Sequence, residues 1–250
     1  MTQFSIVTVC LNSARTIERT LDSVARQQGV DLEHVIVDGV STDDTLNIVR
    51  NHASQGRLRW VSEADAGIYD AMNKGVALAA GELVGFLNSD DRYIDERVLA
   101  DVMESYRSKG CDFIYGDLHM VNEQGQIVRD WKSGELSSSG LTGTQIPHPT
   151  LFVRRQLLNE IHPPFDPSYR LSADLKQQLI LINRMRARGA YIPRALTQMR
   201  LGGASTRSVS GYLLGWRESA RAYNEVFGSG GTWYTVKKVL SKARGIRRMR

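Results

Sequence analysis

ELVGFLNSDDRYIDE, residues 82–96, decides the fold that we predict for this chain. Its apolar run LVGFL ends directly in Asn88, Ser89, Asp90 and Asp91. Adjacent carboxylates repel one another, so a buried strand that ends in two of them needs a positive partner nearby. In an open sheet of parallel strands, ligands bind beyond the carboxyl ends of the strands. The stretch therefore predicts a strand whose end contributes to a ligand site.

Strand-like and helix-like segments alternate on both sides of that stretch over the first 110 residues. Apolar runs rich in β-branched residues are each followed by a segment whose apolar residues recur at helical spacing. We expect strands at residues 4–10, 34–38, 58–63 and 82–87. Such alternation predicts an α/β fold with an open, twisted, mostly parallel sheet flanked by helices. Polar residues then follow the strands along one rim: Thr8, Asp38, Glu63, Asp90 and Asp91.

The second half of the chain is less regular. Residues 112–131 read as a hairpin, and residues 133–145 form a Ser-, Gly- and Thr-rich loop. A strand, a helix and a further strand are expected before residue 203, and helices from residue 208 onward. We expect one domain, residues 1–207, with a C-terminal helical, basic extension, residues 208–250.

Composition indicates an ordinary soluble protein. The 250 residues are 42% hydrophobic and 24% charged, and no run of 18 apolar residues is present. The first residues lack the basic start and cleavage site of a signal peptide. Cys10 and Cys111 lie far apart in apolar runs, which favours reduced thiols over a disulfide. These features predict a cytoplasmic protein.

The positive charge is concentrated in the C-terminal tail, residues 237–250. The tail holds seven Lys and Arg and no acid, which leaves 25 bases against 27 acids in residues 1–236, a net charge of −2. Apolar residues at near-helical spacing among these bases are typical of a helix that lies on an anionic membrane. A solvated, frayed terminus is the alternative. The tail alone does not predict nucleic-acid binding, because no aromatic-rich basic stripe marks the body.

Several enzyme classes are excluded by the motifs that the sequence lacks. No GxGxxG follows the first strand and no GxxxxGK[ST] is present, which argues against a Rossmann dinucleotide enzyme and a P-loop NTPase. No CxxC or HExxH offers a zinc site, and no GxSxG elbow is present. What remains is a carboxylate site. Mg²⁺ or Mn²⁺ would be the positive partner of Asp90 and Asp91, although the two acids could also simply begin the next helix.

Longer motifs connect these features to a known family. They are SIVTVCLNSARTIERTLDSV, VIVDGVSTDDT, EADAGIYDAMNKGVALAAGELVGFLNSDD, HPTLFVRR, SADL and GGAS, within residues 4–205. With them the chain resembles family 2 glycosyltransferases of the GT-A fold, of the bacterial polysaccharide type. GIYDAMNKG, followed by the acidic strand end, is the most specific of these signals.

The resemblance implies roles for the residues on the donor side. Thr8 and Asp38 would hold the nucleoside base, and Ser41 and Asp43 fall in the same nucleotide-facing loop. Asp70 and Lys74 would face the ribose or the diphosphate. Two alternatives stay open: Asp38 could be a capping acid, and Asp70 with Lys74 could form a surface ion pair one helical turn apart.

The resemblance also implies a metal site and a catalytic base. Asp90 would be the metal-binding acid, with Asp91 beside it, and Mn²⁺ or Mg²⁺ the cofactor. The family often has Asp where this chain has Asn88, which brings no charge. Asp174 matches the acid that serves as general base in inverting enzymes, and Lys176 stands where the family often has a further acid.

Asp174 and His148 each have both a functional and a structural interpretation. Asp174 could instead be an acid in the first turn of a helix, with Ser172 as its cap. His148 could be a turn residue or lie on the acceptor side, and Ser205 could contact phosphate.

The function that the resemblance implies is transfer of a sugar from a nucleotide-diphosphate donor to a glycan hydroxyl, with inversion. UDP-sugar is the expected donor, with GDP-sugar as the alternative. The expected acceptor is a glycan, or one linked to polyprenyl pyrophosphate at the inner face of the plasma membrane. A protein that binds nucleotide-sugar or polyanion without transferring sugar is a second hypothesis. A nucleotidyltransferase is a third, but LNSARTIERT lacks the glycines of its expected loop.

Overall fold

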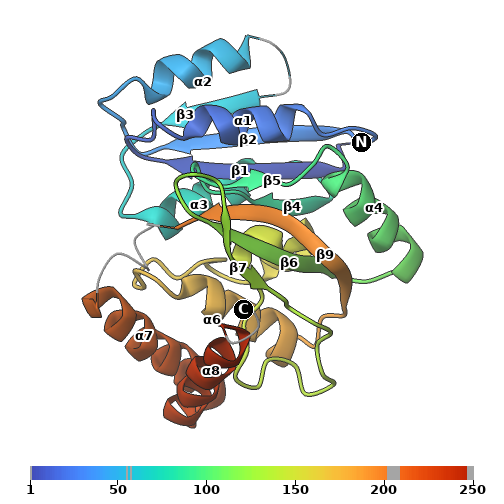
Figure 1. The fold of residues 1–250 in the computed structure, drawn as a ribbon, viewed down its shortest axis with the longest axis vertical. Coiled ribbons are helices and arrows are strands. Elements are labelled where there is room, and N and C mark those ends of the chain that lie inside the picture. The colour runs from blue at the N-terminus through green and yellow to red at the C-terminus, as the bar shows by residue number, and fades with distance from the viewer. Residues whose placement is uncertain (1, 55, 57, 202–208, 247–250) are drawn as a thin grey trace.

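A single curled sheet with helices on both faces forms the body of the protein (Figure 1). The computed structural model describes residues 2–54, 56, 58–201 and 209–246. The nine strands of the sheet follow the order β3-β2-β1-β4-β8-β6-β9-β5, and β7 pairs with β6. The predicted α/β fold with an open, mostly parallel sheet flanked by helices is confirmed.

The first half of the sheet is parallel throughout. Its strands are β1 (Phe4–Cys10), β2 (Leu32–Asp38), β3 (Leu58–Ser62) and β4 (Leu83–Phe86). The connecting helices are α1 (Ile17–Ala25), α2 (Thr45–Ala53) and α3 (Ile68–Leu78). All four strands lie where the apolar runs predict them, and for β1 and β4 the reason is that a strand buried on both faces is apolar along nearly its whole length.

The second half of the sheet is mixed. After the short strand β5 (Arg92–Tyr93) and α4 (Val98–Lys109), the strands are β6 (Phe113–Val121), β7 (Ile127–Trp131), β8 (Phe152–Arg154) and β9 (Gly189–Arg200). β8 runs antiparallel to β4 and β6, whereas β6 and β9 run parallel. Between β8 and β9 lie α5 (Arg155–Glu160), α6 (Ala173–Gln178) and a π-helical turn, Leu179–Arg184. The helix expected there corresponds to α6 and the π-helical turn, which follow one another without a gap.

The side chains of β1 alternate between the two faces of the sheet, and each set belongs to a separate hydrophobic core. Val7 and Val9 belong to one buried cluster, which α3 and α6 cover, and Phe4 and Ile6 belong to another, which α4 covers. Successive side chains of a strand point to opposite faces, so a strand that is apolar at both registers must be covered twice.

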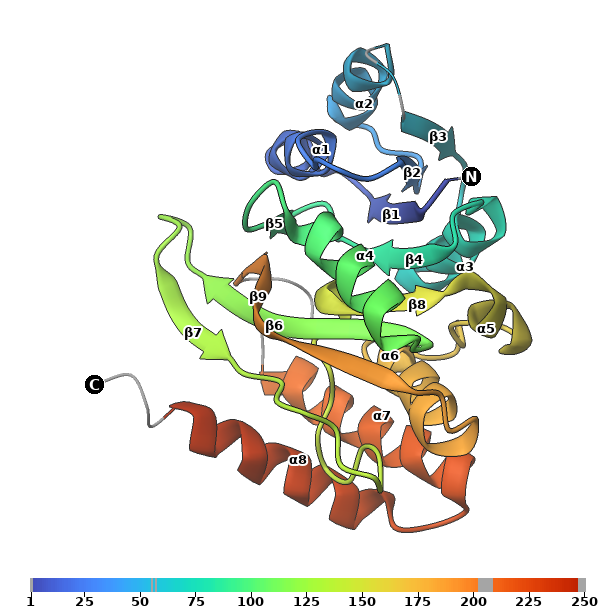
Figure 2. The same cartoon turned by 90° about the vertical axis from the view of Figure 1, so that its right-hand side faces the viewer.

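Two C-terminal helices, α7 (Val209–Phe227) and α8 (Gly231–Ile246), pack side by side under the second half of the sheet (Figure 2). Ala222 and Tyr234 from these helices are buried in the same cluster as Phe113 and Tyr115 of β6. The expected boundary between residues 207 and 208 falls outside the described residues. Within the described part of the chain, no helix is both long and apolar enough to span a membrane.

The loop after β2 holds a strained residue. Val40 has φ +65°, in the left-handed region that β-branched side chains rarely adopt, and its side chain is half exposed. Val40→Gly is expected to raise the free energy of unfolding by about 1 kcal/mol. Relief of about 1–3 kcal/mol of strain exceeds the extra entropy of glycine in the unfolded chain, about 0.4–1 kcal/mol. Thermal unfolding should show a midpoint about 2–4 °C higher.

Val40→Ala is the matched control for that substitution. It removes the two methyl groups but keeps the Cβ, so most of the strain should remain and the midpoint should rise by less than half as much. A fall in the midpoint for Val40→Gly would show that the loop conformation is not strained.

Candidate active site

Four strand ends meet at one edge of the sheet, the edge opposite the N-terminus in Figure 1. Cys10 pairs with Asp38 and Asp38 with Ser62, so β1, β2 and β3 finish level with one another. β4 ends beside them at Phe86, which pairs with Val7. The loops that follow these strands carry most of the polar residues that the sequence singled out.

Asp38 is fully buried at the end of β2 and organises the loop that follows. Its carboxylate accepts hydrogen bonds from the Ser41 amide (3.0 Å) and the Ser62 hydroxyl (2.7 Å). The Ser41 hydroxyl also donates to it. No side chain caps the following helix α2, because the Ser41 side chain binds Asp38. Any ring N–H from a ligand base would share this carboxylate with Ser41.

Thr8 does not reach the rim. Its side chain is fully buried, its hydroxyl donates to the Leu87 carbonyl (2.7 Å), and His34 Nε2 lies 2.9 Å away. The prediction that Thr8 contacts a base is therefore not supported. Thr8 occupies an interior position of β1, and its hydroxyl is already satisfied across the sheet.

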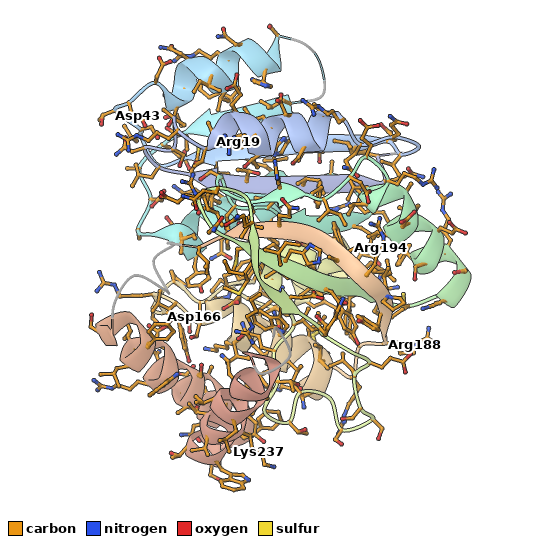
Figure 3. All side chains as sticks on the ribbon, viewed as in Figure 1. Arg19, Asp43, Asp166, Arg188, Arg194 and Lys237 are labelled. Carbon is orange, nitrogen blue, oxygen red and sulfur yellow. The ribbon has the colours of Figure 1, made fainter. Side chains whose placement is uncertain are left out.

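Hydrogen bonds join the loops after β1 and β2 into one surface. Asp43 accepts from the Ala14 amide (3.1 Å) and from the amide and hydroxyl of Thr45 (3.1 and 2.5 Å). The Thr45 hydroxyl bond is the main reason that the pKa of Asp43 is lowered. Figure 3 places Asp43 at this edge. Ser13 and Ser89 bring the loop after β4 into contact, with 2.9 Å between their hydroxyl oxygens.

The two adjacent carboxylates after β4 lie in different environments. Asp91 is buried, and it accepts from the Asn88 side-chain amide (3.0 Å) and the Arg200 backbone amide (3.3 Å). Burial, with the charge of Asp90 adding to it, raises the pKa of Asp91 well above its usual range. Asp90 is only half-buried. Of the two acids predicted to hold a metal, only Asp90 lies where a ligand could reach it.

Asn88 therefore has a role that a second carboxylate could not fill. It donates a hydrogen bond to a buried acid, whereas an aspartate in its place would put two anions at hydrogen-bond distance. The hydrogen bond to Asp91 therefore explains why an uncharged side chain suits position 88.

Lys74 on α3 is paired with acids on the rim. Its ammonium group lies 3.0 Å from Glu63 and 3.7 Å from Asp70, and it donates to the Ala64 carbonyl (2.6 Å). The hydrogen bond to Glu63 is the main cause of the raised pKa of Lys74. The ion pair between Asp70 and Lys74 is thus present, and it stands at the same edge as the strand ends.

Asp65 also lies on the rim, although our sequence analysis gave it no role. A Cβ at position 39 would come within 2.6 Å of its carboxylate, so only glycine allows Asp65 to lie this close to the loop after β2. The other carboxylate oxygen of Asp65 accepts from the Gly67 amide (2.9 Å). The signal was present as the pattern Asp-x-Gly immediately before α3.

Asp174 lies in the first turn of α6 with its carboxylate oriented by two donors. Gln145 Nε2 donates to Oδ2 (2.7 Å), and the Tyr69 hydroxyl donates to Oδ1 (3.4 Å). Burial, together with the charge of Asp174, raises the pKa of Tyr69 well above its usual range, so Tyr69 stays a donor. The structural interpretation of Asp174 as an acid in the first turn is borne out, but Ser172, at the N-cap position, makes no side-chain capping hydrogen bond. Tyr69 and the rim residue Asp70 are neighbours on α3. This helix therefore connects Asp174 to the rim.

His148 packs in an aromatic cluster that includes Tyr69, the residue that donates to Asp174. Its ring stacks on Phe86 with 5.0 Å between centroids and meets the edge of Phe165 at 5.6 Å. Phe165 in turn stacks on Tyr69 at 6.1 Å. Burial lowers the pKa of His148, against an opposing effect of Asp174. Neither ring nitrogen has a hydrogen-bond partner among the described residues. His148 is thus a neutral ring within an aromatic stack that ends at Asp174.

The motifs can now be compared with known proteins. A family model described as "Glycosyl transferase family 2" matches residues 5–162. The chain belongs to glycosyl transferase family 2. The matched residues of this family 2 protein include the whole strand-end rim and His148. They end before Asp174, α7 and α8.

Relatives and solved structures agree with the family. The chain is 37% identical over 174 residues to a PGL/p-HBAD biosynthesis glycosyltransferase of Mycobacterium bovis (strain BCG / Pasteur 1173P2), covering 68% of this chain and 66% of that protein. It is 32% identical over 146 residues to a chondroitin synthase of Pasteurella multocida (strain Pm70), covering 58% of this chain and 15% of that protein. The fold of TarS 1–349 from S. aureus with UDP-GlcNAc is similar (TM-score 0.69, 20% identity, 99% of this chain and 73% of that one). So is the mannosyltransferase PcManGT from Pyrobaculum calidifontis with GDP-Man and Mn²⁺ (TM-score 0.67, 17% identity, 99% and 76%).

Lys176 of this family 2 chain neither faces Asp174 nor stands free in solvent. Its ammonium group is held by Asp166 (2.7 Å) and by Glu225 of α7 (2.6 Å). Figure 3 places Asp166 between the body and α7. Ser205, the predicted phosphate contact, lies outside the described residues.

The ion pair between Asp166 and Lys176 is expected to make stability depend on pH. Burial raises the pKa of Asp166, but hydrogen bonds from Lys176 and Ser168 outweigh it and hold the pKa at about 2. The folded-state pKa is thus below the usual value of about 3.9, so the pair stabilises the fold above that pH. This contribution of about 2 kcal/mol is lost as the pH falls through about 2.

Urea unfolding between pH 7 and pH 2 tests this dependence. Asp166→Asn should lower the free energy of unfolding at pH 7 and make it fall less steeply below pH 4. Parallel curves for the variant and the wild type would contradict the assignment.

Proposed function

We propose that this protein is an inverting glycosyltransferase that uses a nucleotide-diphosphate-sugar donor and a glycan hydroxyl as acceptor. The observation that carries the proposal is the placement of Asp174. Its carboxylate is oriented by Gln145 and Tyr69, and Tyr69 lies in the first turn of α3, the helix that bears Asp70 and Lys74 on the rim. A candidate base and a polar strand-end site are thereby brought together by α3.

The strand-end loops support binding of the donor nucleotide. Asp38 and Ser41 offer a carboxylate and a hydroxyl at the end of β2, where open α/β sheets bind their ligands. Solved structures of similar fold bind UDP-GlcNAc, UDP and GDP-Man. We propose a UDP-sugar as donor and a GDP-sugar as the alternative.

The acids after β4 fit a divalent cation that a diphosphate helps to hold. No group of three or more His, Cys, Asp or Glu side chains among the described residues could hold a metal by itself. Mg²⁺ and Mn²⁺ usually need only one or two carboxylates, because waters and substrate phosphates complete their ligand sets. Asp90 would be the protein ligand, and a cation there would also relieve its repulsion with Asp91. When bound, the ion offsets the negative charge that develops on the leaving diphosphate.

Asp174 would act as general base in a single displacement. Its carboxylate takes the proton from an acceptor hydroxyl as that oxygen attacks the anomeric carbon. The bond from the anomeric carbon to the diphosphate oxygen breaks on the opposite face, which inverts the configuration. Gln145 and Tyr69 keep the carboxylate oriented during this proton transfer.

A lipid-linked acceptor is supported by the outer face of α8. Trp233 is 63% exposed, and Val236 and Leu240 follow it on the same face at helical spacing. Lys237 lies over the Trp233 ring at 5.4 Å, and Figure 3 shows it at the far end of the molecule from Asp43. An amphipathic helix with an aromatic residue and bases is suited to an anionic membrane surface. We therefore propose peripheral attachment near a polyprenyl-pyrophosphate-linked glycan in surface polysaccharide biosynthesis.

The donor proposal is tested by thermal unfolding with UDP, GDP, dTDP and CMP, each with and without Mn²⁺. A nucleotide at 100 times its dissociation constant should raise the midpoint by roughly 5–10 °C, from about 2.7 kcal/mol of binding free energy. NMR of the transfer product then gives its anomeric configuration. A retained configuration would rule out the single displacement, and nucleotide binding without transfer would favour a binding protein on the same fold.

A further inference from the structure

The C-terminal helices contact two segments next to Asp174. One of them hydrogen-bonds its carboxylate, and the other closely precedes it in the chain. One segment is the loop at residues 143–146, which ends beside the Asp174 carboxylate through Gln145. The other is the stretch 170–172, immediately before α6. Neither α7 nor α8 lies within the residues that the family model matches.

α8 fixes the position of the first segment. The Tyr234 hydroxyl, on a side chain only 3% exposed, donates to the carbonyl of Thr144, the residue before Gln145. The Ser241 hydroxyl also lies 3.3 Å from the Gly143 carbonyl, but its shorter contact, 2.9 Å, is with the Lys238 carbonyl of its own helix. On the other side, the Gln178 side chain exchanges two hydrogen bonds with the Ile146 backbone, both 3.0 Å. The loop is therefore held between α8 and α6 on both sides of Gln145.

α7 fixes the position of the second segment. Glu218 is buried, and its two carboxylate oxygens accept from the backbone amides of Arg170 and Leu171, each at 2.8 Å. Glu225, about two helical turns further along α7, binds Lys176 on α6. The start of α6 and its first full turn are thus both attached to α7.

The contacts from α7 and α8 matter because, among the described residues, only two hydrogen bonds between side chains, from Tyr69 and Gln145, orient the Asp174 carboxylate. The Tyr69 bond is long at 3.4 Å, so the shorter Gln145 bond at 2.7 Å is the principal contact that orients the carboxylate. The loop that carries Gln145 contains several glycines, and glycine loses more backbone entropy on ordering than any other residue. Without the contacts from α8, the loop would lose order and the carboxylate would lose its orientation.

We propose that the C-terminal helix pair positions the catalytic base, with Gln145 as a positioning residue for Asp174 and Tyr234 and Glu218 as the contacts through which α8 and α7 act. The proposal rests on the proposed function in one respect, that Asp174 is the general base. It assigns to residues 209–246 a part in the reaction, in addition to any contact with a membrane.

The test uses the full chain and measures release of nucleoside diphosphate from UDP-glucose, UDP-N-acetylglucosamine and GDP-mannose, with the fastest donor carried forward. Gln145→Glu should lower kcat about 100-fold while the donor KM changes less than threefold, because misplacing a catalytic group by about 1 Å costs that much. The acidic limb of its kcat profile should move up by at least about one pH unit, since a new carboxylate beside Asp174 disfavours the ionised base. A residue with only a structural role would not move that limb.

Tyr234→Phe removes a single hydroxyl and tests the contribution of α8. It should lower kcat about tenfold at unchanged donor KM. Without the hydrogen bond to Thr144, the loop spends less time in the conformation that places Gln145 beside Asp174. Tyr223→Phe is the matched control. Tyr223 stacks on Tyr234 at 4.7 Å, and its hydroxyl makes no hydrogen bond within the described part of the chain, so its kcat should equal the wild-type value.

Asp174→Asn separates failure of this inference from failure of the proposed function. If Asp174→Asn keeps wild-type kcat, Asp174 is not the base, and both the mechanism and this inference are overturned. If it abolishes turnover while Gln145→Glu and Tyr234→Phe keep wild-type kcat and pH profile, the mechanism stands and only the inference is overturned. Loss in all three variants, with Tyr223→Phe unaffected, supports both.

Discussion

Replacing Asp174 with asparagine is expected to lower kcat for sugar transfer by about 10³-fold, within the range that a general base contributes. The substitution keeps the size and shape of the side chain, so Gln145 can still donate to the remaining oxygen. It removes the group that accepts the proton of the acceptor hydroxyl. Steady-state kinetics with the donor at saturation measure the effect, and the donor KM should stay within about threefold because Asp174 does not bind nucleotide.

Asp166→Asn is the matched comparison for this substitution. Asp166 precedes α6 and pairs with Lys176, so its loss should weaken the fold without removing a proton acceptor. Measured well below its unfolding temperature, Asp166→Asn should retain most of the wild-type kcat. A loss for Asp174→Asn no larger than that for Asp166→Asn would mean that Asp174 supports the fold and takes no proton.

Replacing Asp90 with asparagine is expected to weaken Mn²⁺-dependent binding of the donor nucleotide by about 100-fold, or about 2.7 kcal/mol. Asparagine keeps an oxygen ligand but removes the charge that attracts the cation. Titration calorimetry with UDP or GDP, with and without Mn²⁺, measures the loss. Binding in the absence of metal should change little, because the contacts to base and ribose lie on the other loops.

Asp91→Asn distinguishes the two adjacent acids. Asp91 is buried and already accepts from Asn88 and Arg200, so it is not placed to meet the diphosphate. Its asparagine variant should bind nucleotide and Mn²⁺ nearly as the wild type does. Equal losses for the two variants would show that both carboxylates hold the cation, as the sequence alone predicts.

The sequence by itself determined the parallel half of the fold. Apolar runs place β1 to β4 within a few residues of their positions in the structure, and the amphipathic segments between them predict that helices connect these strands. The reason is that buried parallel strands and one-sided helices leave a local apolar pattern, which one chain shows without any partner. The motifs within residues 4–205, among them GIYDAMNKG and the acidic strand end, also predicted the family correctly.

The tertiary structure alone decided which side chains of the predicted site face outward. Asp90 and Asp91 are neighbours in sequence, yet one lies on the rim and the other is buried with its own donors. Thr8 is interior, and Asp65 lies over Gly39. Such differences depend on how loops from separate strands pack together, and no periodicity within one segment encodes them.

The hydrogen bonds that hold Asp174 and its neighbouring segments in place could not be predicted from the sequence either. Gln145 stands 29 residues before it, and Glu218 lies 47 and 48 residues after the backbone amides that it binds. Tyr234 lies 90 residues after the carbonyl that it holds. Single hydrogen bonds between distant segments carry no repeating signal, because each depends on one pair of residues that only the folded chain brings together. The sequence therefore determined the parallel half of the sheet and the residue types of the site. The tertiary structure decided how those residues are held and which of them a ligand can reach.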